Sequence, residues 1–144
     1  MSDNEGFLIS AASTISSQTA DIEEKIDRLQ KAKNDLVSEQ ETCMNEVEQC
    51  RKPELFPLWD GEKGKGYDEK REEVYTIMES IYENDYNAKI SLIESKISSL
   101  NFQKSALSAT NSLINTANDL LSMGEEAMQE LTSTIGEIKG RLFG

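Results

Sequence analysis

The sequence predicts an all-α fold: a long antiparallel two-helix hairpin, similar to a coiled coil, with a W-x-G turn and an extended C-terminal helix. Apolar residues recur every seven positions in two long stretches of the chain. The break between these stretches holds both prolines and three of the eight glycines. A hydrophobic content of 37% and a charged content of 29% favour a few long helices with narrow apolar faces. We therefore expect one helical domain over residues 1–144.

The first predicted helix covers residues from about 5 to 52. Its main row has a strict seven-residue spacing: Leu8, Ile15, Ile22, Leu29, Leu36, Cys43 and Cys50. A second row is more polar: Ala12, Thr19, Ile26, Lys33, Gln40 and Val47. This pattern predicts one uninterrupted helix of about 70 Å. Cys43 and Cys50 would lie roughly 10.5 Å apart on it, which is too far for a disulfide bond. We therefore interpret both cysteines as small residues of the helix seam.

The break predicts a chain reversal over residues 53–66. Pro53 and Pro57 should end the first helix, because proline lacks a backbone donor and restricts the residue before it. Gly61 and the two glycines that follow provide a permissive backbone. The second helix is predicted over about 67–142, with a seven-residue row of Ile93, Leu100, Leu107, Ile114, Leu121, Met128, Ile135 and Leu142. Upstream of that row, an apolar face is predicted from Val74, Met78, Ile81, Tyr82, Tyr86 and Ile90.

The segment around Ser122 leaves two interpretations open. Ser122 and Glu125 have the spacing of a capping box, which would start a third helix. The seven-residue row passes through this segment in register, which favours one continuous helix. A continuous helix would outrun the first one, and nothing in its own chain would cover the row of Leu121, Met128, Leu131, Ile135, Ile138 and Leu142. We therefore predict that a partner or a second copy covers it.

Two uncharged stretches, residues 6–20 and 105–118, predict where a partner binds. Exposed helical surfaces usually carry charges for solubility, so uncharged ones need an explanation. A hairpin that pairs position 51 with position 67 places 6–20 opposite about 98–112, so the two stretches meet. We predict a docking surface for partner helices that includes Leu8, Ile15, Leu107 and Ile114. The alternative interpretation is an ordinary two-helix seam.

The inventory of side chains excludes several functions. The chain has no histidine, so it cannot form a Ser-His or Cys-His catalytic pair, and we expect it not to be an enzyme. We expect no cofactor and no metal site, since two cysteines without histidine make a poor zinc site. A net charge of -12 without a basic patch argues against nucleic acid and anionic membranes. The N-terminus does not resemble a Sec signal peptide, and no stretch is apolar enough to span a bilayer.

The spacing within the break carries a family resemblance. Trp59 and Gly61 form a W-x-G, and Tyr67 follows at the start of the second predicted helix. A long helix, W-x-G in the turn and an aromatic residue opening a second long helix resemble the WXG superfamily of helical hairpins, which are substrates and partners of type VII secretion. The length of the chain is similar to that of the YwqH-like accessory proteins of LXG-domain toxins. The resemblance covers residues 5–110, and the tail beyond is additional.

The resemblance implies a function in protein delivery. The protein would be a cytoplasmic adaptor or targeting chaperone that binds the helical N-terminal domain of an LXG-like toxin, together with another small helical protein. Tyr75 and Glu79 fit the letters of a Y-x-x-x-D/E export signal but lie early in the second helix, so we expect the signal on a partner that takes the chain along if it is exported. Two alternatives stay open: a self-associating, homodimeric secreted protein of WXG type, and a coiled-coil tether unrelated to secretion.

Overall fold

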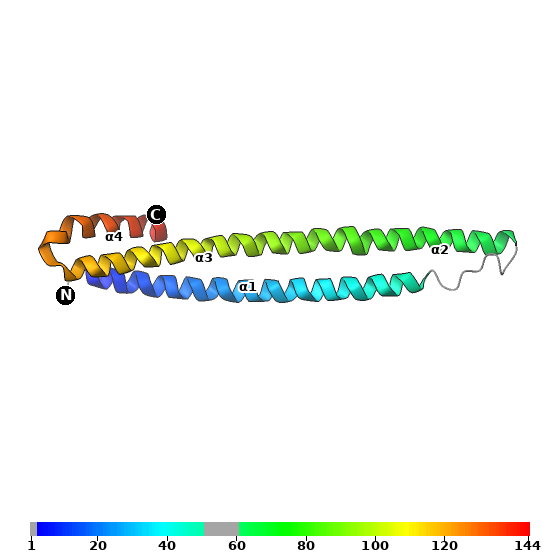
Figure 1. Cartoon of the computed structure of the whole chain (residues 1–144), viewed down its shortest axis with the longest axis horizontal. Coiled ribbons are helices and arrows are strands. Elements are labelled where there is room, and N and C mark those ends of the chain that lie inside the picture. The colour runs from blue at the N-terminus through cyan, green and yellow to red at the C-terminus, as the bar shows by residue number, and fades with distance from the viewer. Residues whose placement is uncertain (1–2, 51–60) are drawn as a thin grey trace. The chain divides into compact units, whose positions relative to one another are not determined.

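The computed structural model describes residues 3–50 and 61–144, and nearly all of them are helical (Figure 1). In chain order the elements are α1 (Asp3–Gln49), α2 (Glu62–Ser80), the π-helix η1 (Ile81–Asp85), α3 (Tyr86–Ser122), the 3₁₀-helix η2 (Gly124–Ala127) and α4 (Met128–Phe143). From Glu62 to Ser122 the helical structure is continuous. The predicted all-α class is confirmed for the described residues. The W-x-G turn stays a prediction, because Trp59 and both prolines lie outside them.

The chain divides into two compact units. Unit 1 joins Met1–Asp27 to Ser98–Gly144, and unit 2 is the single segment Arg28–Ile97. In each unit a segment of α1 runs antiparallel to a segment of the helical stretch that follows it in the chain (Figure 1). Unit 1 has α4 as a third helix, folded back beside α3 (Figure 1). Only unit 1 can therefore bury apolar side chains among three helices.

The core of unit 1 draws on all three of its helical segments. Its buried members are Leu8, Ala11, Ile15, Ile114, Ala117, Leu120, Ala127, Leu131, Ile135 and Ile138. Ala11 and Ala117 have no exposed surface, and residues this small allow helices to approach closely. Both uncharged stretches contribute to this core. Their lack of charge therefore has a cause within the chain, since α4 packs where charged side chains would be buried at a cost.

The prediction of a continuous helix past Ser122 is wrong. Gly124 has φ of 82°, a left-handed conformation that commonly ends helices and that glycine adopts without steric cost. The Ser122 hydroxyl donates to the carbonyl of Asp119 at 2.7 Å, so this serine does not cap a third helix. The chain reverses here and α4 packs back on unit 1. The predicted lack of cover for Leu131, Ile135 and Ile138 is therefore also wrong, because all three are buried in the chain's own core.

Polar residues of the predicted α1 seam have partners in unit 2. Lys33 pairs with Glu94, with 3.1 Å between Nζ and Oε1. The Gln40 side-chain amide donates to the Tyr82 carbonyl at 2.6 Å and to Asn87 Oδ1 at 2.9 Å. Tyr82 lies in η1, and a π-helix disrupts the regular hydrogen-bond ladder of an α-helix. Gln40 therefore satisfies a carbonyl of the irregular turn, and such polar seam contacts fix the register of two helices.

The observed register differs from the predicted one. Residues 6–20 were expected opposite about 98–112, whereas Leu8 and Ile15 share a core with Ile114 and Leu120. The prediction paired the helix ends near 51 and 67. In the structure α2 begins earlier, at Glu62, and runs through Gly64 and Gly66. The end of α1 is bonded to Arg71, whose Nε donates to the Cys50 carbonyl at 2.9 Å. The start of α2 therefore extends past α1, which shifts the pairing.

Candidate functional site

The residues of the predicted turn motif are only partly described. Trp59 lies outside the described residues. Gly61 has an extended backbone, with φ of 166° and ψ of 169°, directly before α2. Tyr67 lies within α2 rather than at its start, is 57% exposed, and has the Arg71 guanidinium carbon 5.6 Å from its ring centroid. The structure thus pairs Tyr67 with Arg71, and its role in a turn motif stays a prediction.

The predicted partner-binding residues fall into three groups by burial. Six lie in the core of unit 1: Leu8, Ile15, Ile114, Leu131, Ile135 and Ile138. Leu107, Leu121 and Leu142 are half-buried and pack against that core. Met128 is 45% exposed. The structure therefore brings nine of the ten together as one core that the chain itself fills, and their contact with a partner stays a prediction.

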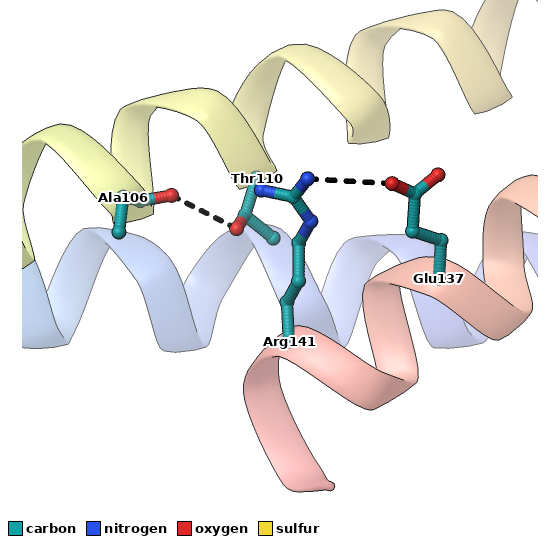
Figure 2. A network of polar contacts seen from close by, with 4 residues as sticks. All are labelled: Ala106, Thr110, Glu137 and Arg141. Carbon is teal, nitrogen blue, oxygen red and sulfur yellow. Dashed lines mark hydrogen bonds and ion pairs between the residues drawn. The ribbon is translucent and has the colours of Figure 1, made fainter.

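The contacts at the C-terminal end of α4 hold this helix to unit 1. Phe143 packs edge-on against Phe7 with 6.4 Å between ring centroids, and Lys139 Nζ lies 5.1 Å from the centroid of the same Phe7 ring. Arg141 pairs with Glu137 at 3.3 Å and points from α4 toward the α3 segment that carries Thr110 (Figure 2). The end of α4 thus combines exposed charges with the exposed Phe143 ring, which rests on the half-buried Phe7.

A hollow of about 300 Å³ lies beside Arg141, with Ile22, Leu107 and Thr110 in its wall. The Thr110 hydroxyl donates to the Ala106 carbonyl at 3.0 Å (Figure 2). This bond leaves the apolar part of the threonine to face its surroundings, because its donor is used within its own helix. Ile22, Ala106 and Leu107 give the hollow its apolar wall, and Gln18, Gln103 and Arg141 add polar side chains.

Sequence reasoning missed an exposed apolar face on α2. It assigned Val74 and Ile81 to the same face as Met78 and Tyr82. In the structure Met78 and Tyr82 are half-buried, whereas Val74 is 50% and Ile81 43% exposed. Ile77, which the prediction did not include, is 61% exposed. The spacing of three and four residues could have revealed a second apolar face, since such residues are neighbours on a helix surface.

Two stretches of unit 2 near this face carry acidic side chains without basic ones. Residues 34–50 contain five acidic and no basic side chains, and residues 72–88 likewise contain five and none. Two tyrosines bridge the helices: the Tyr75 hydroxyl donates to Glu48 at 2.9 Å, and the Tyr86 hydroxyl donates to Glu39 at 3.0 Å. A neutral phenol donor from the helical stretch 62–122 thus meets a carboxylate of α1 at each of these two places.

These hydrogen bonds keep the phenols protonated. Hydrogen bonding to Glu79 and then to Glu48 raises the pKa of Tyr75 to about 12. The hydrogen bond to Glu39 likewise raises the pKa of Tyr86. A phenol with the ordinary pKa of 10.0 would lose its proton at a lower alkaline pH and place a second negative charge beside the carboxylate. Tyr75 and Glu79, which match the letters of the export signal, therefore interact with each other inside α2.

Two further properties of the described residues bear on function. Over residues 3–50 and 61–144, none of the helices has the length and apolar character that crossing a membrane requires. In the same part of the chain no His, Cys, Asp and Glu side chains gather in a group that could hold a metal ion. Cys43 and Cys50 are both free thiols. The described surface does, however, place apolar side chains beside carboxylates, as where Ile77 lies next to Glu72 and Glu73.

These features define a small, acidic, all-helical protein with a three-helix core at one unit and an acidic, partly apolar surface at the other. A family model described as YwqH-like matches residues 7–126, and the chain belongs to this family. It is 34% identical over 135 residues to Protein YwqH of Bacillus subtilis (strain 168), which covers 94% of this chain and 96% of the relative. The YwqH-like resemblance is thus confirmed. No solved structure matches the chain.

Proposed function

We propose that this protein is a non-enzymatic adaptor that binds the helical N-terminal domain of a type VII-secreted, LXG-like toxin together with another small helical protein. Membership of the YwqH-like family supports the proposal, because the proposal rests on the resemblance to YwqH-like accessory proteins. The observation that carries it is the exposure of Val74, Ile77 and Ile81 on one helix, because bulky apolar side chains grouped on a surface favour association with another protein. The adaptor would act in the cytoplasm, with the export signal supplied by a partner.

Co-expression tests this function. The full-length chain carries an affinity tag and is produced with the helical N-terminal domain of the toxin encoded beside it and with the neighbouring small helical protein. We expect the toxin domain to be retained in a complex of fixed stoichiometry, while the separate C-terminal domain of the toxin, the matched control, is not retained. A chain that purifies alone as a stable dimer and retains neither neighbour would contradict the proposal.

The predicted turn motif provides a second arm of the test. In an adaptor, Trp59→Ala should abolish retention of the toxin domain, whereas a simple tether would lose only some stability. Circular dichroism separates the two effects, because it shows whether the variant keeps its helical content. A folded Trp59→Ala variant that retains the toxin domain at the wild-type level would remove Trp59 from the proposed site.

A further inference from the structure

Val74 and Ile77 of α2 and Ile81, the first residue of η1, form a continuous apolar surface, which we name the α2 apolar face. Their spacing of three and then four residues puts neighbours one above the other on an α-helix. The helix is regular up to this point, since the Ile81 backbone N–H donates to the Ile77 carbonyl. Between 43% and 61% of each residue is exposed. The face thus has the geometry of one half of a helix–helix seam. In the described part of the chain no second helix covers it.

The packing of unit 2 does not use this face. Two α2 residues bond to α1: Arg71 donates to the Cys50 carbonyl, and Tyr75 donates to Glu48, among other interactions of this side. Met78 and Tyr82 continue this α1-facing side, and both are half-buried. The three apolar residues lie on the adjoining side of the helix. A partner that covers them would leave the hydrogen bonds of Arg71 and Tyr75 to α1 in place.

The charge around the α2 apolar face specifies its occupant. Glu69, Glu72 and Glu73 line a hollow together with Ile77 of this face, while Lys70 precedes Val74 by one helical turn. Residues 72–88 and residues 34–50 of the neighbouring α1 each carry five acids and no base. A second copy would bring the same negative charge, which opposes association of two like surfaces. A helix with Lys and Arg beside its own apolar residues would match both the apolar and the acidic parts.

We propose that the α2 apolar face binds a cationic amphipathic helix of a partner protein, with Val74, Ile77 and Ile81 in the apolar contact and the surrounding carboxylates opposite its Lys and Arg side chains. This inference rests on the proposed function only in that the protein binds a helical partner. Beyond the proposed function, the inference states which surface of the protein binds and which side chains the partner helix must carry. It does not require that partner to be a toxin.

Binding of two designed helical peptides to the full-length chain tests the inference by fluorescence anisotropy. The basic probe has Leu in its apolar row with Lys and Arg on its flanks, and the acidic probe replaces every Lys and Arg by Glu. We expect only the basic probe to bind. The combined variant Val74→Gln, Ile77→Gln and Ile81→Gln should weaken its binding by at least about tenfold, since the apolar contact is lost. Added salt should also weaken binding, because it screens exposed charges.

Leu92→Gln is the matched control. Leu92 is 71% exposed in the same unit but does not belong to the α2 apolar face. Its loss should change the affinity for the basic probe by less than about twofold. Circular dichroism confirms that both variants keep their helical content, which is expected because glutamine is a good helix former at exposed sites.

Several outcomes would overturn the inference. Equal affinity for the acidic probe, no binding of the basic probe, or full binding by the triple variant each contradict it, and the last would indicate attraction by charge alone. Light scattering tests whether a second copy occupies the face. If the wild-type protein is a dimer and the triple variant is a monomer, the face binds a second copy. If the basic probe fails but the toxin domain is retained, the inference fails and the proposed function stands. If the basic probe binds but the toxin domain is not retained, the proposed function fails and the inference about the α2 apolar face stands.

Discussion

Replacing Ile138 by alanine measures how firmly α4 is docked on unit 1. Ile138 has no exposed surface and lies in a core shared by α1, α3 and α4. The substitution removes three carbons, worth about 0.8 kcal/mol each in transfer free energy. The cavity left behind adds to this, so we expect the free energy of unfolding to fall by about 3 kcal/mol.

Urea denaturation followed by circular dichroism measures this loss, and hydrogen exchange locates it. Because α4 packs through Leu131, Ile135 and Ile138, the amides of α4 should exchange faster in the variant while those of unit 2 change little. Met128→Ala is the matched control in the same helix. Met128 is 45% exposed, so its truncation should cost less than about 1 kcal/mol.

The size of the effect discriminates between the two arrangements of the C-terminal residues. A helix that continued straight past Ser122 would leave Ile138 without neighbours, and its replacement would then cost no more than about 0.5 kcal/mol. An Ile138→Ala loss no larger than that of Met128→Ala would therefore refute the docking of α4 described above. Unchanged exchange rates in α4 would refute it independently.

Three further perturbations test local features. The raised pKa of Tyr75, caused first by hydrogen bonding to Glu79, contributes stability that is present below pH 10.0 and is lost as the pH rises to about 12, so Tyr75→Phe should flatten the stability profile across that window. Gly124→Ala should cost about 1 kcal/mol in thermal unfolding because φ is 82°, whereas Gly136→Ala, within α4 and with open space at its Cβ, should stabilise by a similar amount. A Gly124→Ala variant as stable as wild type would contradict the left-handed turn. Gln40→Ala should cost about 1 kcal/mol and speed hydrogen exchange in η1, since a carbonyl there loses its side-chain donor; unchanged exchange would contradict that role.

The seven-residue periodicity predicted several residues of the unit 1 core, although Met128 of the same row is 45% exposed. Leu8, Ile15 and Ile114 were selected from spacing alone, and all three are buried. The polar members of the seam, such as Gln40, also lie where the period puts them. Periodicity succeeds here because an α-helix turns by a constant angle per residue, so a face is fixed by position in the chain.

The reversal before α4 could not be derived from the same pattern. Leu121 and Met128 keep their seven-residue spacing whether the helix continues or stops. The apolar row therefore cannot show whether the chain reverses between them. The local signal was Gly124, because only its backbone conformation marks the helix end. The α2 apolar face was missed for a related reason: Val74 and Met78 are both apolar, and periodicity cannot decide which of them faces α1 without the register of the two helices.

The division of the chain into units has a consequence for the order of folding. Unit 2 is one contiguous segment, whereas unit 1 joins residues from both ends of the chain and closes a loop that contains all of unit 2. Loop-closure entropy makes such distant contacts form late, and during synthesis the partners of Leu8 and Ile15 are made last. The α1 residues of the unit 1 core therefore stay uncovered until their partners in α3 and α4 have been synthesised. A binding protein or chaperone that meets the nascent chain would encounter an apolar surface that the finished molecule hides.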